Sequence, residues 1–66
     1  MKVTINGAAR EVPEGTTVAQ AVRTLTEQTS GVAAAVNDEV VRRGAWESTA
    51  LGDGDRLEVL TAVQGG

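Results

Sequence analysis

Apolar and polar residues alternate at the start of the chain, with the period of two that is typical of a half-buried strand. Val3 and Ile5 are the apolar positions, and Asn6-Gly7 follows them directly. Asn-Gly favours a two-residue hairpin turn, because both residues tolerate positive φ. The pattern therefore predicts a β-hairpin over residues 1–12, with Ala9–Val12 as the returning strand.

The register of this hairpin leaves two possibilities for Arg10. A two-residue turn places Arg10 opposite Val3, on the face that points to the interior. Either a β-bulge shifts Arg10, or the residue lies at the rim of the sheet with its aliphatic stem buried and its charged head in water. The sequence alone leaves both open.

An amphipathic helix follows the break at Pro13-Glu14-Gly15. Thr17 and Gln20 match a capping box, in which each side chain accepts a hydrogen bond from the other residue's backbone amide. Gly31 is predicted to occupy the left-handed position that ends the helix. A helix of about 11 residues is marginal alone in water, so we expect it to pack on a sheet. The apolar positions have helical spacing and are Val18, Ala21, Val22 and Leu25.

Two short strands and a connection are predicted next. The apolar run Val32–Val36 has the length of a strand that is buried on both faces. Asn37-Asp38 makes a turn, and residues 39–41 continue as a short strand. Residues 42–48 show neither period, so we expect a connection from which Trp46 fills the core.

The last strand is predicted over residues 56–63, after a glycine-rich turn. Leu57 and Val59 share one face of this strand, whereas Leu60 and Ala62 project from the other face. The alternation therefore leaves Leu60 on the side of the sheet that a single helix does not cover.

These elements predict an α+β fold of the β-grasp, or ubiquitin-like, type. One helix with one apolar stripe is expected to pack across a mixed sheet of four to five strands, in two layers. The last strand must then lie beside the first, in the middle of the sheet. We expect a β-grasp domain over residues 1–63 and a flexible tail over residues 64–66.

Composition limits the possible functions. The chain has 66 residues, enough for one domain, and it contains neither Cys nor His. Disulfides, zinc fingers, thiolate nucleophiles and imidazole bases are therefore excluded. The net charge of -3 argues against nucleic-acid binding. We also expect a domain of this size to have no room for a catalytic cleft of several hundred cubic ångströms.

The sequence shows neither a membrane-spanning segment nor a secretion signal. It has no run of about 18 apolar residues, and Met1–Ile5 lacks the apolar segment of a signal peptide. The expected location is the cytoplasm, with no membrane partner.

Few side chains suggest chemistry of their own. Ser30 and Ser48 have no basic partner at a suggestive spacing, so nucleophilic catalysis is not expected. Asp53-Gly54-Asp55 resembles a fragment of a calcium loop but lacks its later ligands, which favours a solvated turn. Arg42-Arg43 is more typical of an exposed turn than of a docking site for an acidic partner. We therefore expect no bound metal or cofactor and no enzyme activity.

The last three residues are Gln64-Gly65-Gly66. They extend to roughly 10 Å, and two of them lack a Cβ atom. One interpretation is a frayed terminus without function. The other is a thin tether, which enters a narrow active-site channel of another enzyme and presents the Gly66 carboxylate there.

The chain resembles the ThiS family of ubiquitin-like sulfur carrier proteins along its whole length. Two positions depart from the usual family pattern: Arg42 stands where a proline often precedes the arginine, and Gln64 stands where a third glycine is common. The matching residues are Val3-Thr4-Ile5-Asn6-Gly7, Gly15-Thr16-Thr17-Val18, Val36-Asn37-Asp38-Glu39-Val40-Val41, Trp46, Leu51, Gly52-Asp53-Gly54-Asp55 and Gln64-Gly65-Gly66.

This resemblance implies a mechanism and partners. An E1-like adenylating enzyme of the ThiF type would use ATP and Mg²⁺ to convert the Gly66 carboxylate into an acyl-adenylate. Sulfur drawn from cysteine through a cysteine desulfurase would replace AMP and leave a thiocarboxylate. A thiazole synthase of the ThiG type would then take that sulfur for the thiazole ring of thiamine.

Two alternatives to the thiamine carrier stay open. One is a carrier on the same fold that supplies sulfur for molybdopterin, cysteine or a secondary metabolite. The other is a protein modifier that is joined to lysines through Gly66. Leu60 and Ala62 are candidate docking residues for the activating enzyme, and the opposing possibility is that residues 42–51 cover Leu60.

Overall fold

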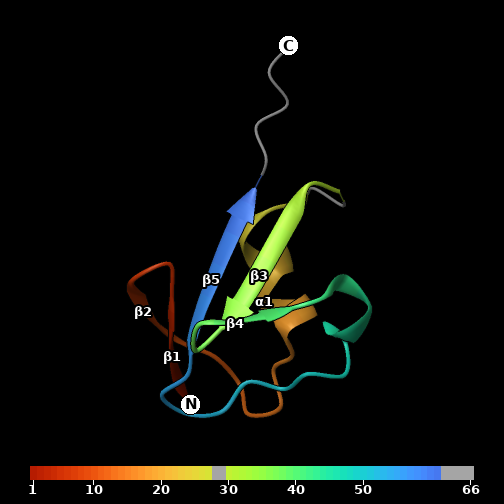
Figure 1. Cartoon of the computed structure of the whole chain (residues 1–66). Helices are drawn as coiled ribbons and strands as arrows, with labels where there is room; N and C mark the ends of the chain where they lie inside the picture. The colour runs from red at the N-terminus through yellow and green to blue at the C-terminus, as the bar shows by residue number, and fades with distance from the viewer. Residues whose placement is uncertain (28–29, 62–66) are drawn as a thin grey trace.

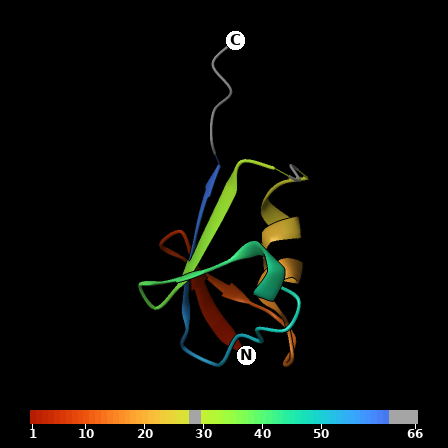
Figure 2. The same cartoon turned by 45° about the vertical axis from the view of Figure 1, so that its right-hand side comes forward.

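The computed structural model describes residues 1–27 and 30–61. These residues form two layers, a sheet and one α-helix that lies on a single face of it (Figures 1 and 2). The elements are β1 (Lys2–Ile5), β2 (Ala8–Glu11), α1 (Val18–Leu25), β3 (Val32–Val36), β4 (Glu39–Val41), the 3₁₀ helix η1 (Arg43–Ala45) and β5 (Arg56–Thr61).

The sheet has five strands in the order β2-β1-β5-β3-β4. β5 is parallel to β1 and antiparallel to β3, so the last strand lies in the middle of a mixed sheet. This is the β-grasp arrangement, and it confirms the predicted fold class and the predicted position of the last strand. α1 has 8 residues, whereas a membrane-spanning helix needs about 20, so no helix of the described residues crosses a membrane.

The first hairpin has the register of a two-residue turn. Asn6 and Gly7 have φ values of 50° and 83°, and Val3 pairs with Arg10 without a bulge. All of β2 is exposed, Arg10 included. The structure thus excludes the bulge and places Arg10 on the edge strand β2, where the residue is exposed. The returning strand is Ala8–Glu11, one residue earlier than predicted.

The capping box at the start of α1 is confirmed. The Thr17 amide donates to Gln20 Oε1 at 3.0 Å, and the Gln20 amide donates to Thr17 Oγ1 at 3.2 Å. The predicted end of the helix is wrong. Helix α1 ends at Leu25, and Thr26 is extended, so Gly31 does not cap it, although its φ is 69°. In the last turn the Thr24 hydroxyl donates to the Ala21 carbonyl at 2.6 Å, and the Thr26 amide makes the last helical bond, to the Val22 carbonyl at 3.1 Å.

The core lies between α1 and the facing side of the sheet. The predicted burial of β3 on both faces is wrong, because α1 covers only one face: Ala34 is buried and Ala33 is exposed. The buried apolar residues are Val3, Ile5, Val18, Ala19, Ala21, Val22, Ala34, Trp46, Leu51, Leu57 and Val59.

Trp46 fills the core from the connection between β4 and β5, as predicted. Its side chain is buried, and its indole Nε1 donates to the Val41 carbonyl at 2.7 Å. The Arg43 guanidinium lies 4.8 Å from the centre of the ring and covers its outer face. The single aromatic residue is therefore held by packing, one hydrogen bond and one cation–π contact.

Candidate functional site

The candidate site is the C-terminal end of β5, the central strand of the sheet. Thr61 is the last residue of β5. The predicted tail residues Gln64, Gly65 and Gly66 lie outside the described residues, as does the docking candidate Ala62. The structure thus describes the strand that precedes the predicted tail in the chain, and the contacts that hold this strand in place.

Asn6 holds the middle of β5. Its Oδ1 accepts a hydrogen bond from the Val59 amide at 2.8 Å, and its Nδ2 donates to the Val59 carbonyl at 3.2 Å. The Asn6 backbone amide also donates to the Leu57 carbonyl at 2.9 Å. One residue therefore both forms the hairpin turn and extends the pairing of β1 with β5.

A second set of contacts fixes the beginning of β5. Asn37 has a φ of 51°, its side-chain oxygen accepts from the Arg56 amide at 2.9 Å, and its Nδ2 donates to Asp55 Oδ1 at 3.0 Å. Asp55 Oδ2 also accepts from the Gly52 amide at 2.7 Å. The Gly52 amide, and after it the Asn37 side chain, lower the pKa of Asp55 below its usual range.

The Asp53-Gly54-Asp55 segment forms a turn in which both carboxylates accept hydrogen bonds from backbone amides. Asp53 Oδ1 accepts from the Lys2 amide at 2.7 Å, and the Gly54 amide donates to the Lys2 carbonyl at 2.7 Å. Within residues 1–27 and 30–61, no three His, Cys, Asp or Glu side chains gather as metal ligands would.

The outer face of the sheet carries exposed apolar side chains on β4 and near the end of β5. Leu60 is 72% exposed, so the connection over residues 42–51 does not cover it. Val40 is 81% exposed on the same face, since it pairs with Ala35 in the register that places Leu60 opposite Ala33. We call Ala33, Ala35, Val40 and Leu60 the outer apolar patch.

A shallow hollow adjoins one end of this patch. It has a volume of about 410 Å³ and lies where β3 begins and β5 ends. Leu60 therefore borders a shallow recess in the surface. The residues that line it are Gly31, Val32, Ala33, Leu60 and Thr61.

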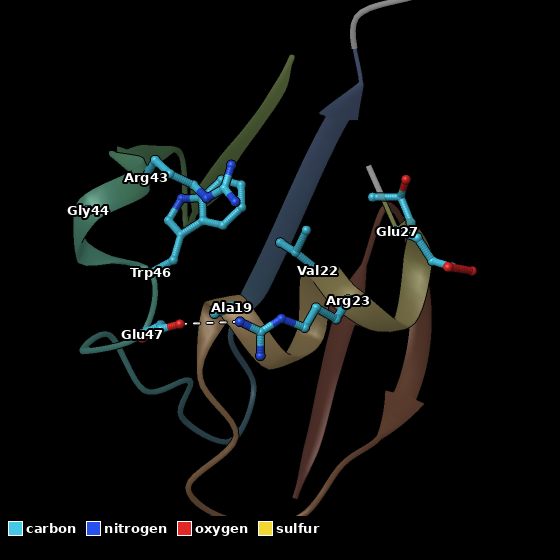
Figure 3. Close-up of a pocket in the computed structure, with 9 residues that line it drawn as sticks. Ala19, Val22, Arg23, Glu27, Arg43, Gly44, Trp46 and Glu47 are labelled. Atoms are coloured by element: carbon cyan, nitrogen blue, oxygen red, sulfur yellow. Dashed lines mark hydrogen bonds and ion pairs between the residues drawn. The ribbon is translucent and has the colours of Figure 1, made fainter. Parts of the chain in front are cut away.

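A larger groove lies on the opposite side of the molecule, between α1 and η1 (Figure 3). Its volume is about 490 Å³, and it is open at the surface, so it is not the interior catalytic cleft that the size of the domain argues against. The small size limits interior space, but α1 and η1 enclose a groove at the surface. An ion pair of Arg23 with Glu47, at 3.2 Å, borders it. The lining residues are Ala19, Val22, Arg23, Thr26, Glu27, Arg43, Gly44, Trp46 and Glu47.

Sequence reasoning missed Val40 and this groove. Val40 could have been found from Asn37-Asp38, because both residues have positive φ (51° and 71°) and a two-residue turn fixes the pairing of Val40 with Ala35. The groove depends on where the irregular connection packs against α1, and no local pattern reports that.

The fold and the exposed end of β5 define a ubiquitin-like β-grasp protein. Residues 3–66 match the model of the ThiS family. The Escherichia coli (strain K12) sulfur carrier protein ThiS is 29% identical over 66 residues, which are the whole of both chains. The chain belongs to the ThiS family, which confirms the resemblance drawn from the sequence.

Two solved structures are similar over the whole chain. The crystal structure of the thiamine biosynthesis protein ThiS from Geobacter metallireducens is 33% identical, with a TM-score of 0.82 and full coverage of both chains. An NMR solution structure of a thiamine biosynthesis protein from the same organism is 32% identical, with a TM-score of 0.81, and covers 88% of that chain and all of this one.

Proposed function

We propose that this chain is the sulfur carrier of thiamine biosynthesis and that the Gly66 carboxylate is its reactive group. The observation that carries the proposal is the family match over residues 3–66, which extends through Gly65 and Gly66. The names of the full-length Escherichia coli relative and of the Geobacter metallireducens structure support the same role and pathway.

The first step is activation by an E1-like adenylating enzyme of the ThiF type. A Gly66 carboxylate oxygen attacks the α-phosphorus of ATP, and pyrophosphate leaves. The Mg²⁺ of the nucleotide neutralises charge on the phosphates. The product is an acyl-adenylate, in which AMP is a good leaving group on the glycine carbonyl.

The second step exchanges oxygen for sulfur. A persulfide, charged from cysteine by a desulfurase, attacks the carbonyl of Gly66 through its terminal sulfur, and AMP leaves. A second thiol then attacks the inner sulfur of the acyl disulfide, forms a disulfide with it and releases the thiocarboxylate. A thiazole synthase of the ThiG type takes this sulfur, and an oxygen atom from the acceptor's carbonyl group or from water replaces it, so that the carrier returns to its carboxylate form.

The features of this chain suit a carrier acted on by other enzymes. It has no Cys, so no thiol of its own attacks the activated carbonyl. Gly65 and Gly66 have no Cβ to crowd a narrow channel. We place the reaction in the cytoplasm, where ATP and reduced thiols are available.

We further propose the outer apolar patch as the docking surface for the activating enzyme. Leu60 and Val40 are the exposed large apolar side chains of the described residues, and both project from one face. Leu60 is one residue from the end of β5, so the patch reaches the end of the strand that leads to Gly66. Exposed apolar residues of this kind commonly form the centre of a protein interface.

Intact-mass analysis with a thiol-directed alkylating reagent tests the carrier role. The full chain is incubated with the activating enzyme, ATP, Mg²⁺ and a sulfur donor, and then alkylated. Because exchange of oxygen for sulfur adds nearly the mass of one oxygen atom, alkylation separates the thiocarboxylate from oxidation of Met1. The expected label is on Gly66 alone, and a variant that lacks Gly66 is the control.

Three results would contradict the proposal. An unlabelled wild-type chain in the complete reaction would exclude the carrier role. Gly66 joined to lysines of larger proteins would indicate a protein modifier. A thiocarboxylate that a thiazole synthase does not consume, but a molybdopterin-forming enzyme does, would place the carrier in another pathway.

A further inference from the structure

The two edges of β5 are paired over different lengths. On one edge, β3 pairs with β5 along five residues, from Val36 opposite Leu57 to Val32 opposite Thr61. On the other edge, β1 pairs only at Arg56 and Leu57 before the chain turns away. Near its end, β5 is therefore paired with a neighbouring strand on the β3 side only, and its edge on the β1 side is open.

On the β1 side, the Asn6 side chain extends the pairing of β5 as far as Val59. Its side chain bonds both backbone groups of Val59, at 2.8 and 3.2 Å, after its own amide has bonded the Leu57 carbonyl. Within the described residues, Asn6 is thus the last group that pairs with β5 on the β1 side. Figure 1 shows the same limit, because the turn between β1 and β2 reaches only part of the way along β5.

The alternation of the backbone places Thr61 on this open side. The backbone groups of Arg56 bond Asn37, on the β3 side. Those of Leu57 and Val59 face β1 and Asn6. Thr61 has the same parity as Leu57 and Val59, so its N–H and C=O point past Asn6, where no described strand lies.

We infer that this open edge at Thr61 pairs with an extended segment of the activating enzyme, added beside β5 as a short strand. The inference rests on the proposed function. Gly66 is the fifth residue after Thr61, so the two lie at most roughly 17 Å apart. The enzyme that holds the Gly66 carboxylate must therefore lie close to the end of β5, where this edge is open.

A strand is the partner that this edge requires. An enzyme surface that covers Thr61 removes water from its N–H and C=O, and this desolvation costs free energy unless the enzyme supplies hydrogen bonds. An extended segment supplies both a donor and an acceptor at the spacing of a sheet. The exposed Leu60 side chain lies next to the same edge and adds apolar contact to the backbone pairing.

The test compares Thr61→Pro with Thr61→Val. Proline removes the N–H and fills the edge with its ring, while β5 keeps its pairing with β3, because the Thr61 amide faces away from β3. Valine keeps the backbone amide. Calorimetric titration of the full chain into the activating enzyme should give binding at least about tenfold weaker for Thr61→Pro and within about twofold of wild type for Thr61→Val. The Tm of all three chains should agree.

Equal binding by Thr61→Pro and wild type, with normal thiocarboxylate formation by wild type, would overturn this inference and leave the proposed function standing. Failure of wild type to form the thiocarboxylate would remove the proposed function instead. If Thr61→Pro lowers the Tm, a semisynthetic chain with an ester in place of the residue 61 amide removes the donor alone. Wild-type binding by that ester would overturn the inference. So would a wild-type dimer that Thr61→Pro abolishes, because a second copy would then occupy the edge.

Discussion

Asn6 and Val59 lie 53 residues apart in the sequence and exchange two hydrogen bonds through one side-chain amide. The amide takes the place of a backbone rung, so the pairing of β5 continues after β1 has ended. A residue in the first turn thereby fixes the strand that leads to the tail.

Replacement of Asn6 should therefore destabilise the domain. Asn6→Ala removes both bonds to Val59 and also places an alanine at a φ of 50°, so we expect the free energy of unfolding to fall by about 2–3 kcal/mol. Asn6→Gly removes the bonds without the strain and should cost about 1–2 kcal/mol. Urea unfolding followed by circular dichroism measures both, and wild-type stability of Asn6→Ala would contradict the role of the side chain.

Asp55 should make the stability depend on pH. The Gly52 amide and the Asn37 side chain lower its folded pKa below the ordinary value of 3.8. The carboxylate thus contributes stability above that value, and the contribution is lost as the pH falls through the folded pKa. We expect the Tm to decline as the pH falls below about 4, and the decline to be shallower in Asp55→Asn. An equally steep decline in both chains would assign the effect to other carboxylates.

Trp46 should dominate the stability of the core. Trp46→Ala removes a buried ring and its hydrogen bond to Val41, and such changes cost about 3–5 kcal/mol. That loss is comparable to the whole stability of a domain of this size. We expect Trp46→Ala to be largely unfolded by far-ultraviolet circular dichroism, and Trp46→Phe to stay folded with a lower Tm.

Charged substitutions in the outer apolar patch should lower adenylation and leave the stability of the domain unchanged. Leu60→Asp and Val40→Asp place charges on side chains that are exposed, so the Tm should change little. Adenylation, measured as exchange of labelled pyrophosphate into ATP, should fall at least about tenfold if the patch docks the activating enzyme. Ala9→Asp, on the exposed edge strand β2, is the matched control. Full activity of Leu60→Asp would exclude the patch as the docking surface.

Local patterns predicted most of this fold, because each depends on residues close together in the sequence. The Asn6-Gly7 turn and the Thr17–Gln20 capping box both have their predicted geometry. The end of α1 was missed because Gly31 offered the strongest local stop signal, whereas the helix ends at Leu25 and Thr26 is already extended.

The parts of the candidate site that escaped prediction depend on distant contacts. Asn6 was predicted as a turn residue, and nothing near it in the sequence indicates its bonds to Val59. The exposure of Leu60 stayed undecided for the same reason, since it depends on the path of residues 42–51 around the core.

A substitution in the tail should abolish thiocarboxylate formation without affecting folding. Gly65→Val adds a branched side chain directly before the reactive residue, and we expect loss of thiocarboxylate formation because the chain no longer fits a narrow channel. The Tm should be unchanged, since the sheet pairs of the described residues extend only to Thr61. Gln64→Ala is the matched control and should keep most of the activity, because it shortens a side chain one position farther from the carboxylate. Alkylation followed by intact-mass analysis measures all three chains. Normal thiocarboxylate formation by Gly65→Val would show that the enzyme's channel accepts a side chain there, so that the missing Cβ atoms would not explain the two glycines.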